Sequence, residues 1–508
     1  MTIFNNILIY FVIIPLLTLG GLALCTNAGR GIRAIRAVAV TGATALVALA
    51  AYLVYYFVTA RAAGVQDAML LRSDVMWYEP FNIKLALGVD GVSVVMIALS
   101  AIIVFAGVFA SWKMNPLPKQ FFLWFFLLST GVFGFFISID LFTMFMFYEV
   151  ALIPMYLLIG VWGSGNKTYS AMKLTLMLMG GSALLMLGII GIYFHSAPEG
   201  SPLTMNILEI AEANAIPHSW QMYLFPLTFV GFGVLGAMFP FHTWSPDGHA
   251  SAPTAVSMLH AGVLMKLGGY GCFRIAICLM PFAANELAWI FLLLTGISVV
   301  YGAFSACVQT DLKYINAYSS VSHCGMVLFA ILMFNTTAMT GAVLQMLSHG
   351  LMTALFFALI GMIYGRTHTR DIQKMGGLMQ IMPYLGVGYV IAGMASLGLP
   401  GLSGFVAEMT IFVGSFMHED TFRRVLTIAG TSSIVITAVY ILRVVGKLLF
   451  GPVVDEHHRQ LTDATWEEKL STATLIVCVA AIGCFPNFFV DIISGSFEPV
   501  VKALNAAM

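Results

Sequence analysis

Apolar runs of about 20 residues follow one another along almost the whole chain, and they constrain its fold more than any other feature. A run of this length is what an α-helix needs to cross a hydrocarbon core ~30 Å thick. Of the 508 residues, 60% are hydrophobic and only 9% are charged, whereas a soluble domain has about 25% charged residues. A water-soluble fold could not hide so much apolar surface. The sequence therefore predicts an all-α polytopic membrane protein.

The apolar runs predict about fourteen transmembrane helices, with boundaries uncertain by about 2–4 residues. No low-complexity linker divides the chain, so we expect residues 1–508 to form a single membrane domain. The predicted spans lie near residues 7–25, 38–58, 91–111, 120–139, 141–162, 173–194, 220–240, 254–280, 287–308, 313–333, 338–364, 382–416, 425–446 and 470–490.

The basic residues are unequally distributed between the two sides of this predicted bundle. Connections after odd-numbered spans hold most of them, among them Lys167, Lys313, Arg366 and Arg370. Basic residues favour the cytoplasmic side, and an even number of spans places both chain ends on one side. We therefore expect a multi-pass protein of the bacterial inner membrane with both termini on the outer, periplasmic side. The net charge of +0 gives no indication of a nucleic-acid partner.

A carboxylate lies deep in the run FMFYEVALIPMYLLIG. Glu149 follows Asp140, the start of its predicted helix, by nine residues. At 1.5 Å per residue it lies about 13 Å into the helix, close to the middle of the bilayer. Lys266 occupies a similar depth in LHAGVLMKLGGYG. A charge there costs roughly 2.5–3.5 kcal/mol and usually marks an ion or proton pathway.

Three further ionisable residues, Glu408, His323 and His349, lie within other predicted spans. Carboxylate, lysine and histidine at mid-depth can exchange protons along a water chain, so these five residues predict a proton relay. The alternative is that each group is hydrogen-bonded and only fixes helix contacts. That alternative is strongest for the histidines, because neighbouring serines could satisfy a neutral ring.

Two helices are predicted to be interrupted. The first break, MFPFHTWSPDGHASAPTAV, contains Pro240, Pro246 and Pro253, and the second, LGLPGLSGF, contains Pro400. Broken backbone at membrane depth is tolerated only where protein or water satisfies it, and paired breaks indicate inverted repeats around a transport path. We expect two inverted five-helix repeats, residues 119–280 and 287–450. The first break could instead be an interfacial loop between two spans.

Four stretches carry a resemblance to a known family. FYEVALIPMYLLIGVWG, FPFHTWSPDGHASAPTAVSMLHAGVLMKLGGYG, TDLKYINAYSSVSHCGM and GLPGLSGFVAEMTIFVGSF resemble the antiporter-like membrane subunits of NADH:quinone oxidoreductase, respiratory complex I, of the subunit M or chain 4 type. The resemblance implies a fourteen-helix subunit of a hetero-oligomeric membrane arm, coupled to quinone reduction elsewhere in the complex. Its partners would be the lipid bilayer and other membrane-arm subunits.

The resemblance also implies a central axis of proton-carrying residues. It assigns Glu149, Lys266, His323, His349 and Glu408 to that axis. Secondary candidates in the same matched stretches are His242, Asp247, His249, His260 and Lys313. The chain shows no Cys cluster and no dinucleotide fingerprint, so we expect no redox centre, cofactor or metal in it. Flavin, iron–sulfur clusters and quinone are expected in partner subunits.

One position departs from the family pattern. The family has a lysine seven residues before the histidine that matches His242, and here that position is Leu235. The partner expected for Glu149 is therefore missing, and either Lys266 replaces it or the relay is interrupted. Three functions stay open: a proton-translocating subunit of complex I, a pump-silent structural subunit of the same arm, and a subunit of a multi-subunit cation/proton antiporter.

Overall fold

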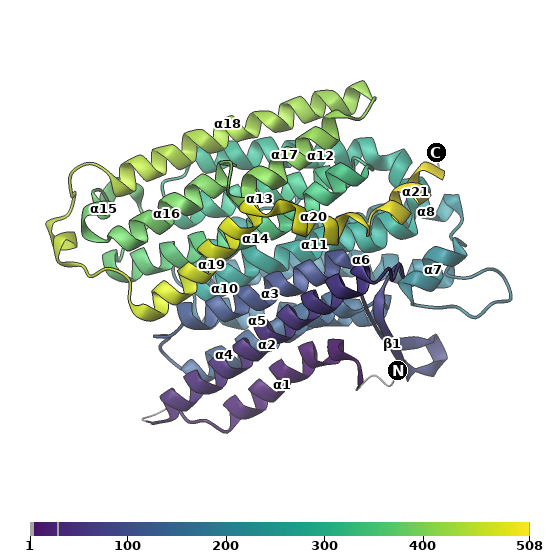
Figure 1. Ribbon diagram of the computed structural model, residues 1–508, viewed down its shortest axis with the longest axis horizontal. Coiled ribbons are helices and arrows are strands. Elements are labelled where there is room, and N and C mark those ends of the chain that lie inside the picture. The colour runs from purple at the N-terminus through teal and green to yellow at the C-terminus, as the bar shows by residue number, and fades with distance from the viewer. Residues whose placement is uncertain (1–4, 28–29, 507–508) are drawn as a thin grey trace.

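The computed structural model describes residues 5–27 and 30–506 as a bundle of long helices that lie side by side (Figure 1). The helices of the first half are η2 (Ile7–Ile9), α1 (Tyr10–Ala23), α2 (Arg30–Ala62), η3 (Glu79–Phe81), α3 (Gly91–Ala110), α4 (Pro118–Ile137), α5 (Leu141–Trp162), α6 (Lys167–Phe194), α7 (Ile207–Ala213), α8 (His218–Leu235), α9 (Trp244–Ser251), α10 (Thr254–Leu259), η4 (His260–Leu264), α11 (Met265–Gly271) and η5 (Cys272–Ile277).

The second half continues the bundle with helices of similar length. They are α12 (Pro281–Val308), α13 (Leu312–Ile331), α14 (Thr336–Thr367), η6 (Ile372–Lys374), α15 (Leu378–Ile381), α16 (Pro383–Ser396), α17 (Ser403–Phe416), α18 (Thr421–Leu449), η7 (Glu456–Gln460), α19 (Trp466–Cys484), α20 (Pro486–Ser494) and α21 (Glu498–Ala506). The almost completely buried α14 lies in the middle of the bundle (Figure 1).

The polytopic membrane character is confirmed. Within residues 5–27 and 30–506, eight helices are long and apolar enough to cross a membrane by themselves, or nine if the bent pair α19–α20 forms one span. The predicted span 141–162 coincides with α5. The total of about fourteen spans stays a prediction, because the remaining helices are not both long and apolar enough by themselves.

The prediction of an all-α fold is wrong in one place. Residues 70–89 form an antiparallel hairpin of strands β1 (Leu70–Tyr78) and β2 (Ile83–Val89), in which Asp74 pairs with Ala86 and Met76 with Lys84. The turn passes through Asn82 in the left-handed region, with φ of 49°. Segments this short fall below the length of a span, so a search for apolar runs of about 20 residues did not detect them.

Both predicted helix breaks are present. The first separates α8, which ends at Leu235, from α9, and the chain turns again at Pro253 before α10. The second separates α16 from α17, and Gly398 and Gly401 adopt φ values of 68° and 92° there. Glycine takes such angles without the strain that a side chain would add. The inverted five-helix repeats stay a prediction.

Acidic and amide caps fix where several helices begin. Asp140 is the N-cap of α5 and accepts hydrogen bonds from the backbone N–H groups of Phe142 and Thr143. Asp311 caps α13 and Asn335 caps α14 in the same way. These side chains satisfy backbone donors that have no partner within the helix. Burial raises the pKa of the Asp140 carboxyl to about 6, although three backbone donors partly offset this effect.

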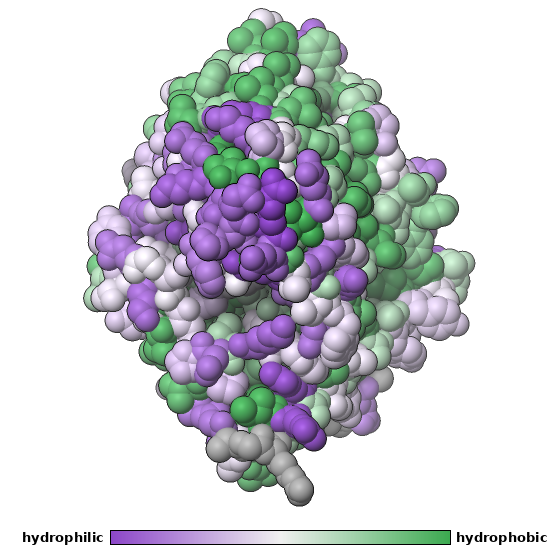
Figure 2. Space-filling view, turned by 90° about the vertical axis from the view of Figure 1, so that its left-hand side faces the viewer, coloured by the Kyte–Doolittle hydropathy of each residue, from purple (hydrophilic) through white to green (hydrophobic). Residues whose placement is uncertain are grey.

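The segments near the two chain ends lie at the same end of the bundle (Figure 1). The backbone N–H of Gly91, which follows β2, donates to the Ser496 hydroxyl between α20 and α21, so the C-terminal segment packs beside the hairpin. The opposite end of the bundle gathers hydrophilic residues, and hydrophobic residues cover its flanks (Figure 2). This distribution fits a membrane-embedded body, while the assignment of either end to a side of the membrane stays a prediction.

Candidate functional site

Lys266 lies in the centre of the bundle and contacts His349. It sits in the short helix α11, between the π-helical turns η4 and η5. Its Nζ lies 2.7 Å from His349 Nδ1 on α14 and also donates to the carbonyl of Ala261. When the amine carries its proton it can only donate, and Nδ1 of His349 is then the acceptor. π-helical turns are rare and often occur at functional sites.

His323 on α13 continues this contact toward Glu408 on α17. The ring centroids of His323 and His349 are 5.1 Å apart, and His323 Nδ1 lies 3.6 Å from Glu408 Oε1. Gln345 Nε2 lies 2.9 Å from the same Nδ1 atom. Lys266, His349, His323 and Glu408 are each no more than 5% exposed. We call these four residues the central cluster. The structure thus brings together four of the five residues predicted for the relay.

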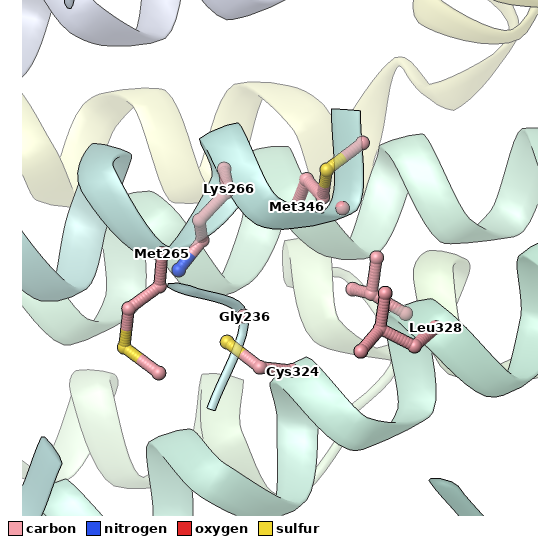
Figure 3. A pocket seen from close by; sticks show the side chains of 8 residues that line it. Gly236, Met265, Lys266, Cys324, Leu328 and Met346 are labelled. Atoms are coloured by element: carbon pink, nitrogen blue, oxygen red, sulfur yellow. The ribbon is translucent and has the colours of Figure 1, made fainter. Parts of the chain in front are cut away.

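A small cavity adjoins the central cluster. It measures about 10 Å³, close to the size of one water molecule. In Figure 3 the Lys266 amine lies on the side of the cavity where Met265 and Cys324 lie. The residues that line the cavity are Gly236, Met265, Lys266, Gly269, Cys324, Val327, Leu328 and Met346. Gly236 follows the end of α8, so the break in that helix forms part of the wall beside the buried amine.

Two secondary candidates, His249 and His260, contact each other next to the central cluster, with their ring planes tilted by 38°. Their ring centroids are 4.3 Å apart, and His249 Nε2 lies 3.4 Å from the sulfur of Met265, the neighbour of Lys266. Both rings are fully or almost fully buried. Within the described residues, His249 Nδ1 and both nitrogens of His260 have no hydrogen-bond partner. A neutral imidazole has one N–H donor and one acceptor nitrogen, so each of these rings can still accept one proton.

Glu149, in contrast, is not part of this cluster. It lies on a half-buried face of α5. Its Oε1 atom is buried without a hydrogen-bond partner in residues 5–27 and 30–506. The suggestion that Lys266 replaces the missing partner of Glu149 is therefore wrong for this conformation, because the amine is engaged by His349 and Ala261.

An apolar cavity next to Leu235 separates α5 from the buried histidines. It measures about 10 Å³ and is lined by Tyr148, Leu152, Met155, Leu178, Leu235, His260 and Leu264. Tyr148 neighbours Glu149 in α5, and its hydroxyl donates to the carbonyl of Leu178 at 3.3 Å. Leu235 thus occupies an apolar gap between the helix that carries Glu149 and His260.

The other secondary candidates lie around α9. Asp247 pairs with Lys173 of α6 at 2.6 Å, and Lys313 Nζ donates to the carbonyl of Ala252 at 2.6 Å. His242, in the break before α9, packs against Tyr301 with ring centroids 5.0 Å apart. In the part of the chain that the structure describes, none of these three candidates forms a hydrogen bond or ion pair with the central cluster.

Sequence reasoning missed several polar residues at these sites. Gln345 and Cys324 are uncharged and gave no signal against their apolar surroundings. Arg274 of η5, which follows the helix that carries Lys266, forms a buried ion pair with Asp90. Both charges lie in or beside an apolar run, and this position in the sequence could have identified them. Within residues 5–27 and 30–506, no group of three or more His, Cys, Asp and Glu side chains is placed to hold a metal ion.

Comparison with solved structures supports the fold. A chain of respiratory complex I from Thermus thermophilus matches with a TM-score of 0.86 and 24% identity, over 98% of this chain and 99% of that one. A chain of the Mrp complex from Dietzia matches with a TM-score of 0.79 and 19% identity, over 98% of both chains. At these identities the matches show a shared fold.

Sequence relatives are more similar. NADH-quinone oxidoreductase subunit M of Pseudomonas aeruginosa is 36% identical over 463 residues, 89% of each chain. Subunit M of Rhodobacter capsulatus is 32% identical over 462 residues, 90% of this chain and 89% of its own length. The family model for the transmembrane region of NADH:quinone oxidoreductase and Mrp antiporters matches residues 138–482. The predicted resemblance is therefore confirmed, and this chain belongs to the NADH:quinone oxidoreductase/Mrp antiporter family of membrane subunits.

Proposed function

We propose that this chain is a proton-translocating subunit in the membrane arm of an NADH:quinone oxidoreductase. The observation that carries the proposal is the buried run of ionisable contacts from Lys266 through His349 and His323 to Glu408. Four ionisable groups in one membrane interior are costly to bury, and such groups usually line a proton or ion path. The named relatives, at 32% and 36% identity, favour a complex I assembly.

In this proposal a proton moves between neighbouring groups of the central cluster. Lys266 donates to His349 across 2.7 Å, a distance typical of direct transfer along a hydrogen bond. The longer steps, between the two rings and from His323 to Glu408, would need a bridging water or a small side-chain movement. His249 and His260 extend the path on the other side of Lys266. The chain itself supplies acid–base groups, and flavin, iron–sulfur clusters and quinone belong to partner subunits.

A second candidate function is a pump-silent subunit of the same membrane arm. The observation that favours it is the gap at Leu235, which leaves Glu149 outside the central cluster and without a basic partner among the described residues. A third candidate, a subunit of a cation/proton antiporter, follows from the family description and from the shared fold with the Mrp complex. Copurification with subunits that carry flavin and iron–sulfur clusters would separate the third candidate from the first two.

The proposed function is tested by the number of protons moved per electron in the reconstituted complex. Lys266→Met removes the buried base but keeps a flexible apolar stem. We expect it to lower the proton-to-electron ratio while the complex stays assembled. Glu149→Gln is the companion variant, and a ratio that falls with Lys266→Met but not with Glu149→Gln would place Glu149 outside the working path. An unchanged ratio in both variants would contradict pumping and favour the structural subunit.

A further inference from the structure

Three polar residues from three helices meet beside the central cluster. Lys173 Nζ of α6 lies 2.6 Å from Asp247 Oδ2 of α9, and the Tyr314 hydroxyl of α13 donates to Asp247 Oδ1 at 3.0 Å. α9 packs against both α6 and α13. Asp247 therefore links a helix of the first half of the chain to a helix of the second half, at the broken segment between them.

This group differs from the central cluster in its access to the surroundings. The side chains of Lys173 and Asp247 are each 24% exposed, whereas His249, His260 and Lys266 are at most 2% exposed. Lys173 lies six residues after the start of α6, about 9 Å along the helix, between the bundle end and its middle. The three side chains thus lie between the end of the bundle and the buried histidines, where a water path from that end would pass.

Charged side chains also hold the other end of α9. Arg370 Nη1 donates to the carbonyl of Ala250 at 2.6 Å, and Lys313 Nζ donates to that of Ala252. Cations at a helix C-terminus satisfy free carbonyls and favour the helix dipole. Helix-breaking residues flank α9 on both sides, so these contacts and Asp247 fix its position. His249 lies two residues after Asp247 on this helix, so a shift of α9 that releases Asp247 would also move His249.

We propose that Lys173, Asp247 and Tyr314 form a gate that controls access of water from this end of the bundle to His249. The inference rests on the proposed proton relay, for which the gate would supply the connection to bulk water. In the conformation described here the gate is closed, because the ion pair is formed and His249 is fully buried. When the pair opens, water reaches His249, and a proton passes through His260 to Lys266 or in the reverse direction.

The first test is the proton-to-electron ratio of the reconstituted complex. Asp247→Asn and Lys173→Met remove one charge each, and we expect both to lower the ratio as far as Lys266→Met does. Asp247→Glu and Lys173→Arg keep the charges, so these variants should retain most of the proton-to-electron ratio. Lys167→Met is the matched control on the same helix, where the lysine donates to the exposed carbonyl of Val161 at 2.7 Å. This control should leave the ratio unchanged.

The second test measures access directly. Ser170 is buried beside α9 and accepts a hydrogen bond from Ser251 at 2.7 Å. In a Ser170→Cys variant, we expect a water-soluble maleimide to react slowly, and to react several-fold faster when Asp247→Asn is added. Ser471→Cys is the control, because Ser471 is equally buried near the start of α19 and donates to the carbonyl of Ala106, away from α9. Its reaction should stay slow, which separates opening of the gate from general unfolding.

The outcomes separate the gate from the relay. The gate alone would be overturned if Asp247→Asn kept the full proton-to-electron ratio and left Ser170→Cys labelling unchanged, while Lys266→Met lowered the ratio. An unchanged ratio in Lys266→Met would overturn the relay and the gate with it. Equal acceleration of labelling at Ser170→Cys and Ser471→Cys would show that the pair only stabilises the fold, and would also overturn the gate.

Discussion

At the scale of single residues, the position of Lys266 depends on a close approach of two backbones. Gly268, two residues after Lys266, packs directly against Gly236 and Phe232 at the end of α8. A side chain at Gly268 would meet the backbone N of Gly236 and, at 2.7 Å, the carbonyl oxygen of Phe232. Backbone atoms cannot move aside as a flexible side chain can. The broken helix and the helix that carries the buried amine are therefore held together by a residue without a side chain.

Gly268→Ala is expected to destabilise the protein, because the added methyl group must push α8 away from α11. Overpacking of this kind typically costs about 1–3 kcal/mol. The measurement is the unfolding temperature of the purified complex in detergent, together with its proton-to-electron ratio. Gly446→Ala in α18 is the matched control, since a methyl group there meets no atom within 4 Å. An equal effect of both substitutions would contradict the close-packing argument.

At the scale of elements, side-chain caps fix where several helices begin, and glycine residues lie at the break between α16 and α17. The start of α5 shows this most clearly, because the fully buried Asp140 accepts from two backbone N–H groups of its first turn and from the N–H of Lys84 on β2. The same carboxyl thus ties the helix to the hairpin. Burial raises its pKa to about 6, above the ordinary value of 3.8.

This raised pKa predicts how stability depends on pH. The folded state favours the protonated carboxyl, so the contribution of Asp140 is greatest below about pH 4 and falls as the pH rises toward 6. Across this pH range the contribution of Asp140 to the free energy of unfolding decreases by at most about 3 kcal/mol. Asp140→Asn keeps a side chain that caps well and cannot ionise. The difference in unfolding temperature between the wild-type protein and Asp140→Asn should therefore grow between about pH 4 and pH 7. A constant difference would refute the assignment.

At the scale of the whole molecule, the five residues predicted for the relay are divided into two groups. The central cluster joins α11, α13, α14 and α17, while Glu149 lies apart on α5. The apolar cavity at Leu235 lies between the helix that carries Glu149 and His260. A lysine at this position would bring a base between the two groups. Burying the new lysine would cost roughly 2.5–3.5 kcal/mol, and pairing of this lysine with Glu149 would reduce that cost.

Leu235→Lys is expected to connect Glu149 to the central cluster and to raise the number of protons moved per electron. Leu235→Met is the control, because it changes the shape of the side chain without adding a charge. Glu149→Gln should have no effect in the wild-type background but should cancel the gain in the Leu235→Lys variant. A gain that persists without Glu149 would show that the new lysine acts through another residue.

The sequence by itself determined the class of the molecule and the positions of both helix breaks, and it predicts the depth of the charges. Those features follow from local quantities: the length of apolar runs, the cost of a buried charge and the backbone limits of proline and glycine. Only the tertiary structure decided which charges meet. The sequence predicts similar depths for Lys266 and Glu149, yet the amine contacts His349, 83 residues away in the chain. Depth along a helix axis is readable from sequence, whereas the rotation and packing of each helix, which select its neighbours, depend on all helices together.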